Sequence, residues 1–409
     1  MELIPHSSGG GVASRAYPIR DALPEKPFRS RLLARGSLLR RLDWLLLGAA
    51  FALSATGALL VYSATRGRTV LNQGDPHFFL LRHVANTGIG VALAAGTLWW
   101  GHRRVRDLAP ILYGITALLV LLVLTPVGAT INGSKRWIVL GGGFSVQPAE
   151  FVKVTIILMM ALVLTARVDA GELARPDHRG VLQALAVAGF PALLILLTPD
   201  LGQTMGVAAV VLGVLIAAGV RARWIIGLLA AGVLGAVAVW QFHLMDQYQV
   251  NRFAAFADPA LDPVGVGYNT SQARIAIGAG GLTGSGLFHG AQTNGQFVPE
   301  QQTDFVFSVA GEELGFVGAG LIIALIAVVL WRACRIAREC SELYGTVLAA
   351  GIVSWLAFQS FENIGMNLGI MPVTGLPLPF VSYGGSSMFA GWIAIGLLEA
   401  IRLQRPLRP

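Results

Sequence analysis

Thiols, histidines and charged side chains are all scarce in this sequence of 409 residues. It contains 2 cysteines and 7 histidines, and only 13% of its residues are charged. With so few thiols, at Cys334 and Cys340, and no clustered histidines, both a disulfide framework and a zinc site are disfavoured. The low charge argues against a protein whose whole surface meets water, because soluble domains carry about twice this fraction.

Apolar residues are abundant instead, at 55% of the chain, and they fall into ten long runs. A helix rises about 1.5 Å per residue, so about 20 apolar residues cross the hydrocarbon of a bilayer. The sequence therefore predicts an all-α integral membrane protein with ten transmembrane helices. The predicted helices span residues 43–65, 80–101, 108–127, 148–166, 181–198, 201–220, 224–242, 304–331, 344–366 and 386–401.

Arginines concentrate in every second loop, which indicates the orientation of the chain. They precede the first predicted helix and follow each even-numbered one, as at Arg41, Arg103, Arg223, Arg332 and Arg402. Because short cytoplasmic loops retain cations, both termini are expected in the cytoplasm. Residues 1–41 then form a disordered cytoplasmic tail, 42–402 the transmembrane domain and 403–409 a second tail. The cations do not form one stripe, so no nucleic-acid partner is expected.

Several cations break this rule by lying in the expected outer loops, and such exceptions are places to look for function. They are Arg66, Arg68, Lys135, Arg136, Arg252 and Arg274. Lys135 and Arg136 suit an anionic ligand such as a diphosphate. The neighbouring Trp137 is explained equally well as an anchor at the membrane interface.

The longest outer connection, residues 243–303, is neither apolar enough to span a membrane nor polar enough to be a simple linker. Long loops of this kind are often functional. Residues 271–277 suit a short interfacial helix, and a glycine-rich run follows at 278–286. That run lacks the spacing of a dinucleotide fingerprint. On spacing alone, a turn-rich loop is the favoured interpretation.

Asp304 lies at the outer start of the eighth predicted helix. Its carboxylate could cap the helix, or it could act as a general base whose proton affinity is raised by partial desolvation. The residue types alone leave these two readings balanced. Glu312 and Glu313 lie deeper, where a charge is costly and is usually paired or catalytic.

Other polar residues occur near the same side of the membrane. Glu150 and Lys153 share a helix face, where mutual neutralisation is the favoured interpretation. Asp200 is expected to cap a helix, with a partnership to the nearby cations as the alternative. Residues 361–387 contain prolines and glycines that force non-helical backbone at membrane depth, which predicts a cavity at the outer leaflet.

Several of these segments, in this order, closely resemble the shape, elongation, division and sporulation (SEDS) family of bacterial membrane glycosyltransferases. The likeness covers about residues 42–401. It is carried by residues 132–137, 147–153, 198–204, 272–286, 299–305, 311–315 and 372–387. Residues 43–44 and 362–366 resemble the elongation (RodA-type) branch more than the division (FtsW-type) branch.

The resemblance implies an enzyme of the bacterial cytoplasmic membrane that polymerises lipid II into peptidoglycan glycan strands during elongation. Asp304 matches the essential acid of the family's Thr-Asp-Phe motif, and it would deprotonate the acceptor GlcNAc 4-hydroxyl, which displaces the donor diphosphate with inversion. The family usually has histidine before that threonine; this chain has Gln302, so no histidine is required as a proton partner here. The residues expected to bind substrate are Lys135, Arg136, Trp137, Glu150, Lys153, Asp200, Arg274, Glu300 and Ser386.

The resemblance also implies partners and alternatives. A class B penicillin-binding protein and membrane lipids are the expected partners, and a divalent cation such as Mg²⁺ or Mn²⁺ could assist the diphosphate. A lipid II flippase, a scaffold without activity and a division-type polymerase are the alternatives. Transporters place polar residues near the midplane in related repeats, whereas here they gather at the outer helix ends without a clear repeat, which favours a polymerase.

Overall fold

The structure is a computed structural model that describes residues 38–131, 134–141, 144–242, 250, 252, 256 and 265–404. The chain divides into two units, residues 1–42 and 43–409. In the first unit, residues 38–41 form the short helix α2 (Leu38–Arg41), where the sequence predicts disorder. The rest of the predicted N-terminal tail, residues 243–249 and most of 251–264 of the long loop, and residues 405–409 lie outside the described residues.

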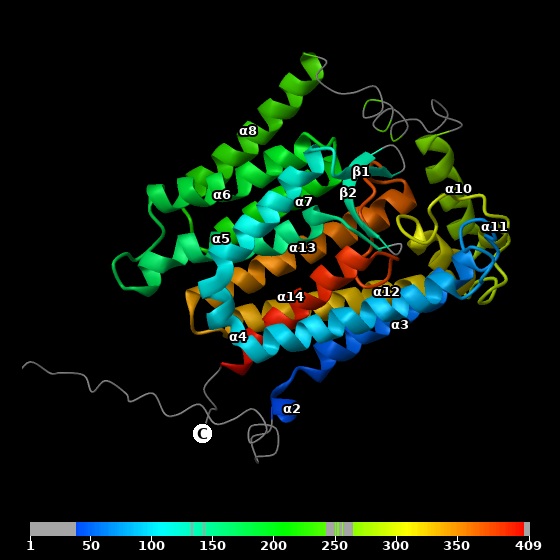
Figure 1. Ribbon diagram of the computed structural model, residues 1–409, viewed down its shortest axis with the longest axis horizontal. Coiled ribbons are helices and arrows are strands. Elements are labelled where there is room, and N and C mark those ends of the chain that lie inside the picture. The colour runs from blue at the N-terminus through cyan, green and yellow to red at the C-terminus, as the bar shows by residue number, and fades with distance from the viewer. Residues whose placement is uncertain are drawn as a thin grey trace, which may run out of the picture. The chain divides into compact units, whose positions relative to one another are not determined.

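The second unit is a bundle of long helices (Figure 1). They are α3 (Trp44–Thr65), α4 (Phe78–Leu124), α5 (Pro148–Asp169), α6 (His178–Leu196), α7 (Leu201–Ala217), α8 (Ala222–Gln241), α12 (Val306–Glu339), α13 (Leu343–Leu368) and α14 (Gly385–Leu403). Within the described ranges, eight of these helices are long and apolar enough to cross a membrane, and α7 is a shorter apolar helix.

Helix α4 accounts for two crossings. It runs for 47 residues and departs from helical geometry at Gly101, where φ is 75° and ψ is 151°. Glycine adopts this left-handed backbone without the clash that a Cβ would cause. Counting the two halves of α4 separately and including α7, the described residues contain ten long apolar helical segments, which fits the predicted all-α membrane fold. The predicted loop at residues 102–107 is wrong, because the chain resumes its helix directly after Gly101.

A small antiparallel sheet between α4 and α5 was not expected from the sequence. It contains β1 (Gly128–Ile131), β2 (Ser134–Gly141) and β3 (Phe144–Val146) in that order. Trp137 lies opposite Ala129, and Ile138 lies opposite Val146. The expected cations Lys135 and Arg136 therefore lie on the central strand of a sheet.

The described part of the long loop contains helices α10 (Val266–Ala279) and α11 (Ala291–Asn294). The short helix predicted over residues 271–277 is confirmed within α10, whose Ala273 and Ala276 are buried and which packs against α12 and α13. The turn-rich prediction holds for the glycine run that follows α10. The glycines after it allow close backbone approach: a Cβ at Gly280 would lie 1.9 Å from the carbonyl oxygen of Gly311. Helix α12 bends here, because Gly315 takes φ 66°.

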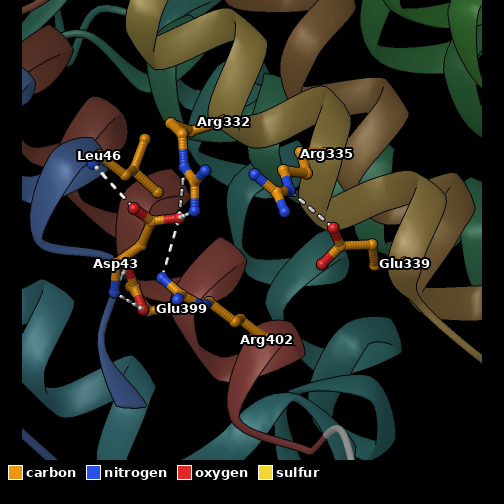
Figure 2. A network of polar contacts seen from close by, with 7 residues as sticks. All are labelled: Asp43, Leu46, Arg332, Arg335, Glu339, Glu399 and Arg402. Carbon is orange, nitrogen blue, oxygen red and sulfur yellow. Dashed lines mark hydrogen bonds and ion pairs between the residues drawn. The ribbon is translucent and has the colours of Figure 1, made fainter. Parts of the chain in front are cut away.

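Charged side chains join α3, α12 and α14 at the end of the bundle opposite to α10 and α11 (Figure 2). The Asp43 carboxylate accepts hydrogen bonds from Arg332 at 2.5 and 2.7 Å and pairs with Arg402 at 2.8 Å. It also accepts from the Leu46 amide at 3.2 Å, which caps α3. The Asp43 amide donates to both carboxylate oxygens of Glu399, at 3.0 and 3.1 Å. Two buried acids and two arginines thus offset each other's charge.

Helix α8 differs from the others because none of its residues is buried. Its apolar side chains, such as Leu234 and Trp240, are exposed. In Figure 1 its C-terminal half extends away from the bundle. A helix with this surface offers apolar area to lipid chains.

Candidate functional site

Helix α12 begins beside the end of α13, where the Ser308 amide donates to the Asn367 side chain. Asp304 and Glu300 immediately precede α12 in the chain. Residues 369–384 connect α13 to α14 there without helical structure. Half of this segment is buried, including Leu376, Leu378 and Val381, and only Ile370 is exposed. Its backbone is therefore enclosed mainly by protein, one of the two environments that permit irregular backbone at membrane depth.

Asp304 lies two residues before α12, and two asparagines of α13 hold its backbone. The side-chain amides of Asn363 and Asn367 donate to the Asp304 carbonyl at 2.9 and 3.1 Å. Asn363 also donates to the Leu376 carbonyl at 2.8 Å, and the Asn367 side-chain oxygen accepts from the Ser308 amide at 3.1 Å. Both asparagines are fully buried. They therefore fix Asp304 and the irregular segment to the same helix.

The residues just before Asp304 are tied to the same irregular segment. The Ser382 hydroxyl donates to the Thr303 carbonyl at 2.5 Å, and the Tyr383 amide donates to the Gln302 carbonyl at 2.8 Å. The Glu300 carboxylate accepts from the side chains of Gln302 and Thr303, both at 3.2 Å. Glu300 thus lies four residues before Asp304, and its carboxylate holds the side chains of two of the intervening residues, Gln302 and Thr303.

The Asp304 carboxylate itself is half-buried and has no hydrogen bond to a described residue. The N-cap of α12 is Phe305 and no side chain caps this helix end, so Asp304 does not cap α12. Burial, and secondarily the charge of Glu300, raise its pKa to about 6, although Arg252 and Arg136 oppose the shift. Gly375 leaves room in front of it, since a Cβ there would lie 3.3 Å from Asp304 Oδ2. An uncommitted carboxylate with a raised pKa can act as a general base.

A pocket of about 130 Å³ lies in the same region, and the charge of Arg252 in its wall acts on the Asp304 carboxylate. Its wall is formed by Arg252, Phe256, Val266, Thr270, Arg274, Gly369, Met371 and Val373. Arg274 is exposed on α10, and Gly369 ends α13 in a left-handed conformation against the Arg274 side chain. The pocket combines two guanidinium groups with apolar side chains.

The cations of the sheet are engaged within the protein. Lys135 Nζ donates to the Leu124 carbonyl at 3.3 Å. Arg136 pairs with Asp200 at 3.2 Å, and both are mostly buried. Asp200 also caps α7 by accepting from the Gln203 amide at 3.2 Å, so it serves both roles considered for it. Burial raises the pKa of Asp200, in spite of Arg136.

Glu150 and Lys153 form a fully buried pair behind the site, as the favoured interpretation expects. Lys153 Nζ lies 3.0 Å from Glu150 and donates to Gln359 at 2.9 Å. Gln203 donates to Glu150 at 2.5 Å, and Gln359 donates to the Pro377 carbonyl at 2.8 Å. The pair therefore links α5, α7 and α13 to the irregular segment. Through Gln359 the pair contacts and stabilises residues 369–384.

Three other predicted polar residues also connect elements. Ser386 is buried, and its hydroxyl oxygen accepts from the Gln147 amide at 2.9 Å, which joins α14 to the start of α5. Glu312 accepts from the amides of Gln292 and Thr293, at 2.7 and 2.9 Å, and thereby anchors α11. Glu313 accepts from Ser63 of α3 at 2.5 Å. Glu312 and Glu313 are thus partnered within the protein.

The structure brings Asp304, Glu300, Arg274 and the charge of Arg136 to one region, and it adds residues that the sequence did not single out for a role. The additions are Arg252, noticed only as an outer cation, and the asparagines Asn363 and Asn367. The two asparagines lie four residues apart and so on one face of a membrane helix. This spacing was the available signal, because buried polar side chains in a membrane need partners.

No three His, Cys, Asp or Glu side chains come together as metal ligands in the part of the chain that the structure describes.

Known proteins resemble this chain over most of its length. Residues 43–406 match the family profile described as "Cell cycle protein", which covers FtsW, RodA and SpoVE. The chain is 38% identical to the probable peptidoglycan glycosyltransferase FtsW of Thioalkalivibrio sulfidiphilus, over 88% of this chain and 89% of that protein. It is 37% identical to stage V sporulation protein E of Bacillus subtilis, over 87% and 95%.

Two solved structures are also similar. A chain of a peptidoglycan synthase complex that coordinates polymerization and crosslinking matches with a TM-score of 0.73 and 32% identity, over 90% of this chain and 99% of that chain. The rod shape determining protein RodA of Thermus thermophilus matches with a TM-score of 0.64 and 31% identity, over 89% and 97%.

Proposed function

This chain belongs to the SEDS family of FtsW, RodA and SpoVE, and we propose that it is a peptidoglycan glycosyltransferase that polymerises lipid II into glycan strands. The observation that carries the proposal is the Asp304 carboxylate. It has a raised pKa and no hydrogen bond to a described residue, and it lies in the region of a cationic pocket. Such a group can accept a proton from a sugar hydroxyl close to an anionic leaving group.

In the proposed reaction, Asp304 takes the proton of the acceptor GlcNAc 4-hydroxyl. The hydroxyl oxygen forms a bond to C1 of the donor MurNAc, and the bond from C1 to the diphosphate oxygen breaks with inversion. The electron pair leaves with the diphosphate, and the proton stays on Asp304 until water removes it. Asn363 and Asn367 hold the base through its backbone carbonyl and leave both carboxylate oxygens available.

We place the site on the outer face of the cytoplasmic membrane, with both termini in the cytoplasm. The arginines at the opposite helix ends support this orientation, because cations are retained on the cytoplasmic side. A class B penicillin-binding protein is the proposed partner. Its support is the likeness to a chain of a complex that coordinates polymerization and crosslinking.

Two observations favour different cellular roles. Residues 43–44 and 362–366 resemble the elongation branch of the family, whereas the similar relatives named FtsW favour a role in division. Depletion of the protein in its own cells separates the two roles. Loss of an elongation enzyme gives rounded cells, and loss of a division enzyme gives filaments.

The activity is tested with the purified full-length chain and fluorescent lipid II in detergent. Glycan chains resolved by gel electrophoresis support the polymerase. Unchanged monomer, together with transfer of lipid II between the leaflets of proteoliposomes, would support a flippase. Unchanged monomer without transfer would support a scaffold. The same assay after chelation of divalent cations tests the proposed Mg²⁺ or Mn²⁺ requirement.

A further inference from the structure

A second pocket, of about 620 Å³, lies where α4 resumes after Gly101, where α5 ends and where α12 connects to α13. Asp304 precedes α12, whereas this pocket lies beyond the other end of that helix. His102, next to the pocket wall, lies 3.4 Å from the Ala400 carbonyl of α14, and the pocket therefore shares its end of the bundle with the Asp43 network. Its volume is in the range of sites that bind small molecules and is much larger than a metal ion.

Five charged side chains line this pocket and leave one negative charge in excess. Arg103 pairs with Glu342 at 2.8 Å. Arg106 pairs with Asp169 at 3.3 Å. Asp107 also lines the pocket and has no ion-pair partner among the described residues. A pocket with this balance disfavours a ligand with a net negative charge and favours one that brings a cation to Asp107.

A backbone carbonyl beside Asp107 has lost its helical donor. Pro110 lies inside α4, and proline has no N–H, so the Arg106 carbonyl does not receive the hydrogen bond that the fourth residue onward normally donates. A primary ammonium group has three N–H donors, and it can therefore serve this carbonyl and the Asp107 carboxylate together. A quaternary ammonium group cannot, because it has no N–H.

Tryptophans place this pocket at the level of the lipid headgroups. Four tryptophans at this end of the bundle are exposed, namely Trp44, Trp99, Trp100 and Trp331. Exposed tryptophans of membrane proteins gather at the interface between lipid and water. The α4 residues of the pocket begin three positions after Trp100, so the pocket lies beside that interface.

An exposed apolar stripe leads from Asp107 toward the hydrocarbon of the membrane. Ile111, Ile115 and Leu118 follow Asp107 at spacings of four, four and three residues, so they share its face of α4. All three side chains are exposed. An acyl chain can lie along this stripe while its headgroup occupies the pocket, whereas a soluble ligand would leave the stripe unused.

We propose that this pocket binds a phospholipid whose headgroup carries a primary ammonium group, as in phosphatidylethanolamine. The ammonium group lies against the Asp107 carboxylate and the Arg106 carbonyl. The phosphate lies against Arg103, which is exposed and contacts Glu342 through Nη2, so its other N–H groups can bind phosphate oxygens. A lipid in this position bridges α4, the end of α5 and the connection from α12 to α13.

The test titrates the purified full-length chain in detergent with dioleoyl phospholipids and measures bound lipid by native mass spectrometry. The wild type is expected to bind phosphatidylethanolamine about tenfold more tightly than phosphatidylcholine or phosphatidylglycerol, as for one charge-assisted hydrogen bond. Asp107→Asn should remove most of this preference, and Asp107→Glu, which keeps the carboxylate, should retain most of it. Glu172→Gln removes an exposed carboxylate between α5 and α6, outside the pocket lining, and should bind as the wild type does.

Three results would overturn the proposal. The first is equal affinity of the wild type for the three lipids. The second is an unchanged preference in Asp107→Asn with the thermal midpoint of the wild type. The third concerns glycerophosphoethanolamine, the headgroup without acyl chains, which should bind at least about tenfold more weakly than the intact lipid. If it binds equally, the occupant is a soluble zwitterion and not a lipid. None of these results affects the proposed polymerase, which fails only if the wild type makes no glycan from lipid II.

Discussion

The raised pKa of Asp304 makes the polymerisation rate depend on pH in a range where an ordinary aspartate would not. Its pKa lies at about 6, compared with 3.8 for an unperturbed carboxyl. A base works only when ionised, so activity is present above the folded-state pKa and is lost as pH falls through it. The ionised fraction is about half at pH 6 and about a tenth at pH 5, whereas an unperturbed aspartate would stay about nine-tenths ionised at pH 5.

The assay follows initial rates of glycan synthesis from saturating fluorescent lipid II between pH 5 and pH 8. Return to pH 7.5 after each acid exposure must restore the rate, which excludes unfolding. The charge of Glu300 is the second-largest cause of the raised pKa of Asp304, after burial. Glu300→Gln removes this charge, so the midpoint of the pH–rate profile should move to lower pH. A flat profile down to pH 5, or a midpoint that Glu300→Gln leaves unchanged, would refute the role of Asp304 as the base in this environment.

Three other predictions follow from the packing around the site and at the opposite end of the bundle. Asn363→Ala removes a hydrogen bond to the Asp304 carbonyl, so kcat should fall at least about tenfold with little change in KM, and Asn363→Ser should recover part of it. Asp43→Asn should lower the free energy of unfolding, measured by thermal unfolding, by about 3 to 5 kcal/mol, because it leaves buried arginines uncompensated. Arg332→Met should destabilise the Asp43→Asn variant less than it destabilises the wild type. In a chain without its native cysteines, Leu282→Cys should react with an impermeant maleimide added outside intact spheroplasts; reaction only after lysis would reverse the proposed orientation.

The membrane crossings were predictable because their signal is local. Each crossing is a run of apolar residues, and the arginines mark alternate ends. The break in α4 was misjudged because His102, Arg103 and Arg106 look like a loop, yet helical backbone satisfies its own hydrogen bonds and needs only Gly101 to bend. The sequence does not predict the strands within residues 128–146, because the mixture of apolar and polar positions there is typical of a polar outer loop.

The site was predicted only in part, because its arrangement depends on contacts between distant segments. Asp304 could be proposed from its place before a helix and from the resemblance to the family. Nothing local to Asn363 and Asn367 indicates that they hold the Asp304 carbonyl, about sixty residues earlier in the chain. The pairing of Arg136 with Asp200 could be named as an alternative but not chosen, since both partners have other plausible roles.

The most direct measurement compares wild type and Asp304→Asn, purified in the same detergent, for glycan synthesis from fluorescent lipid II and for lipid II binding. Asparagine keeps the size of the side chain and removes its ability to accept a proton. Glycan synthesis should fall below detection in Asp304→Asn while lipid II binding stays within about threefold of wild type. Glycan synthesis at the wild-type rate in that variant would contradict the assignment of Asp304 as the catalytic base.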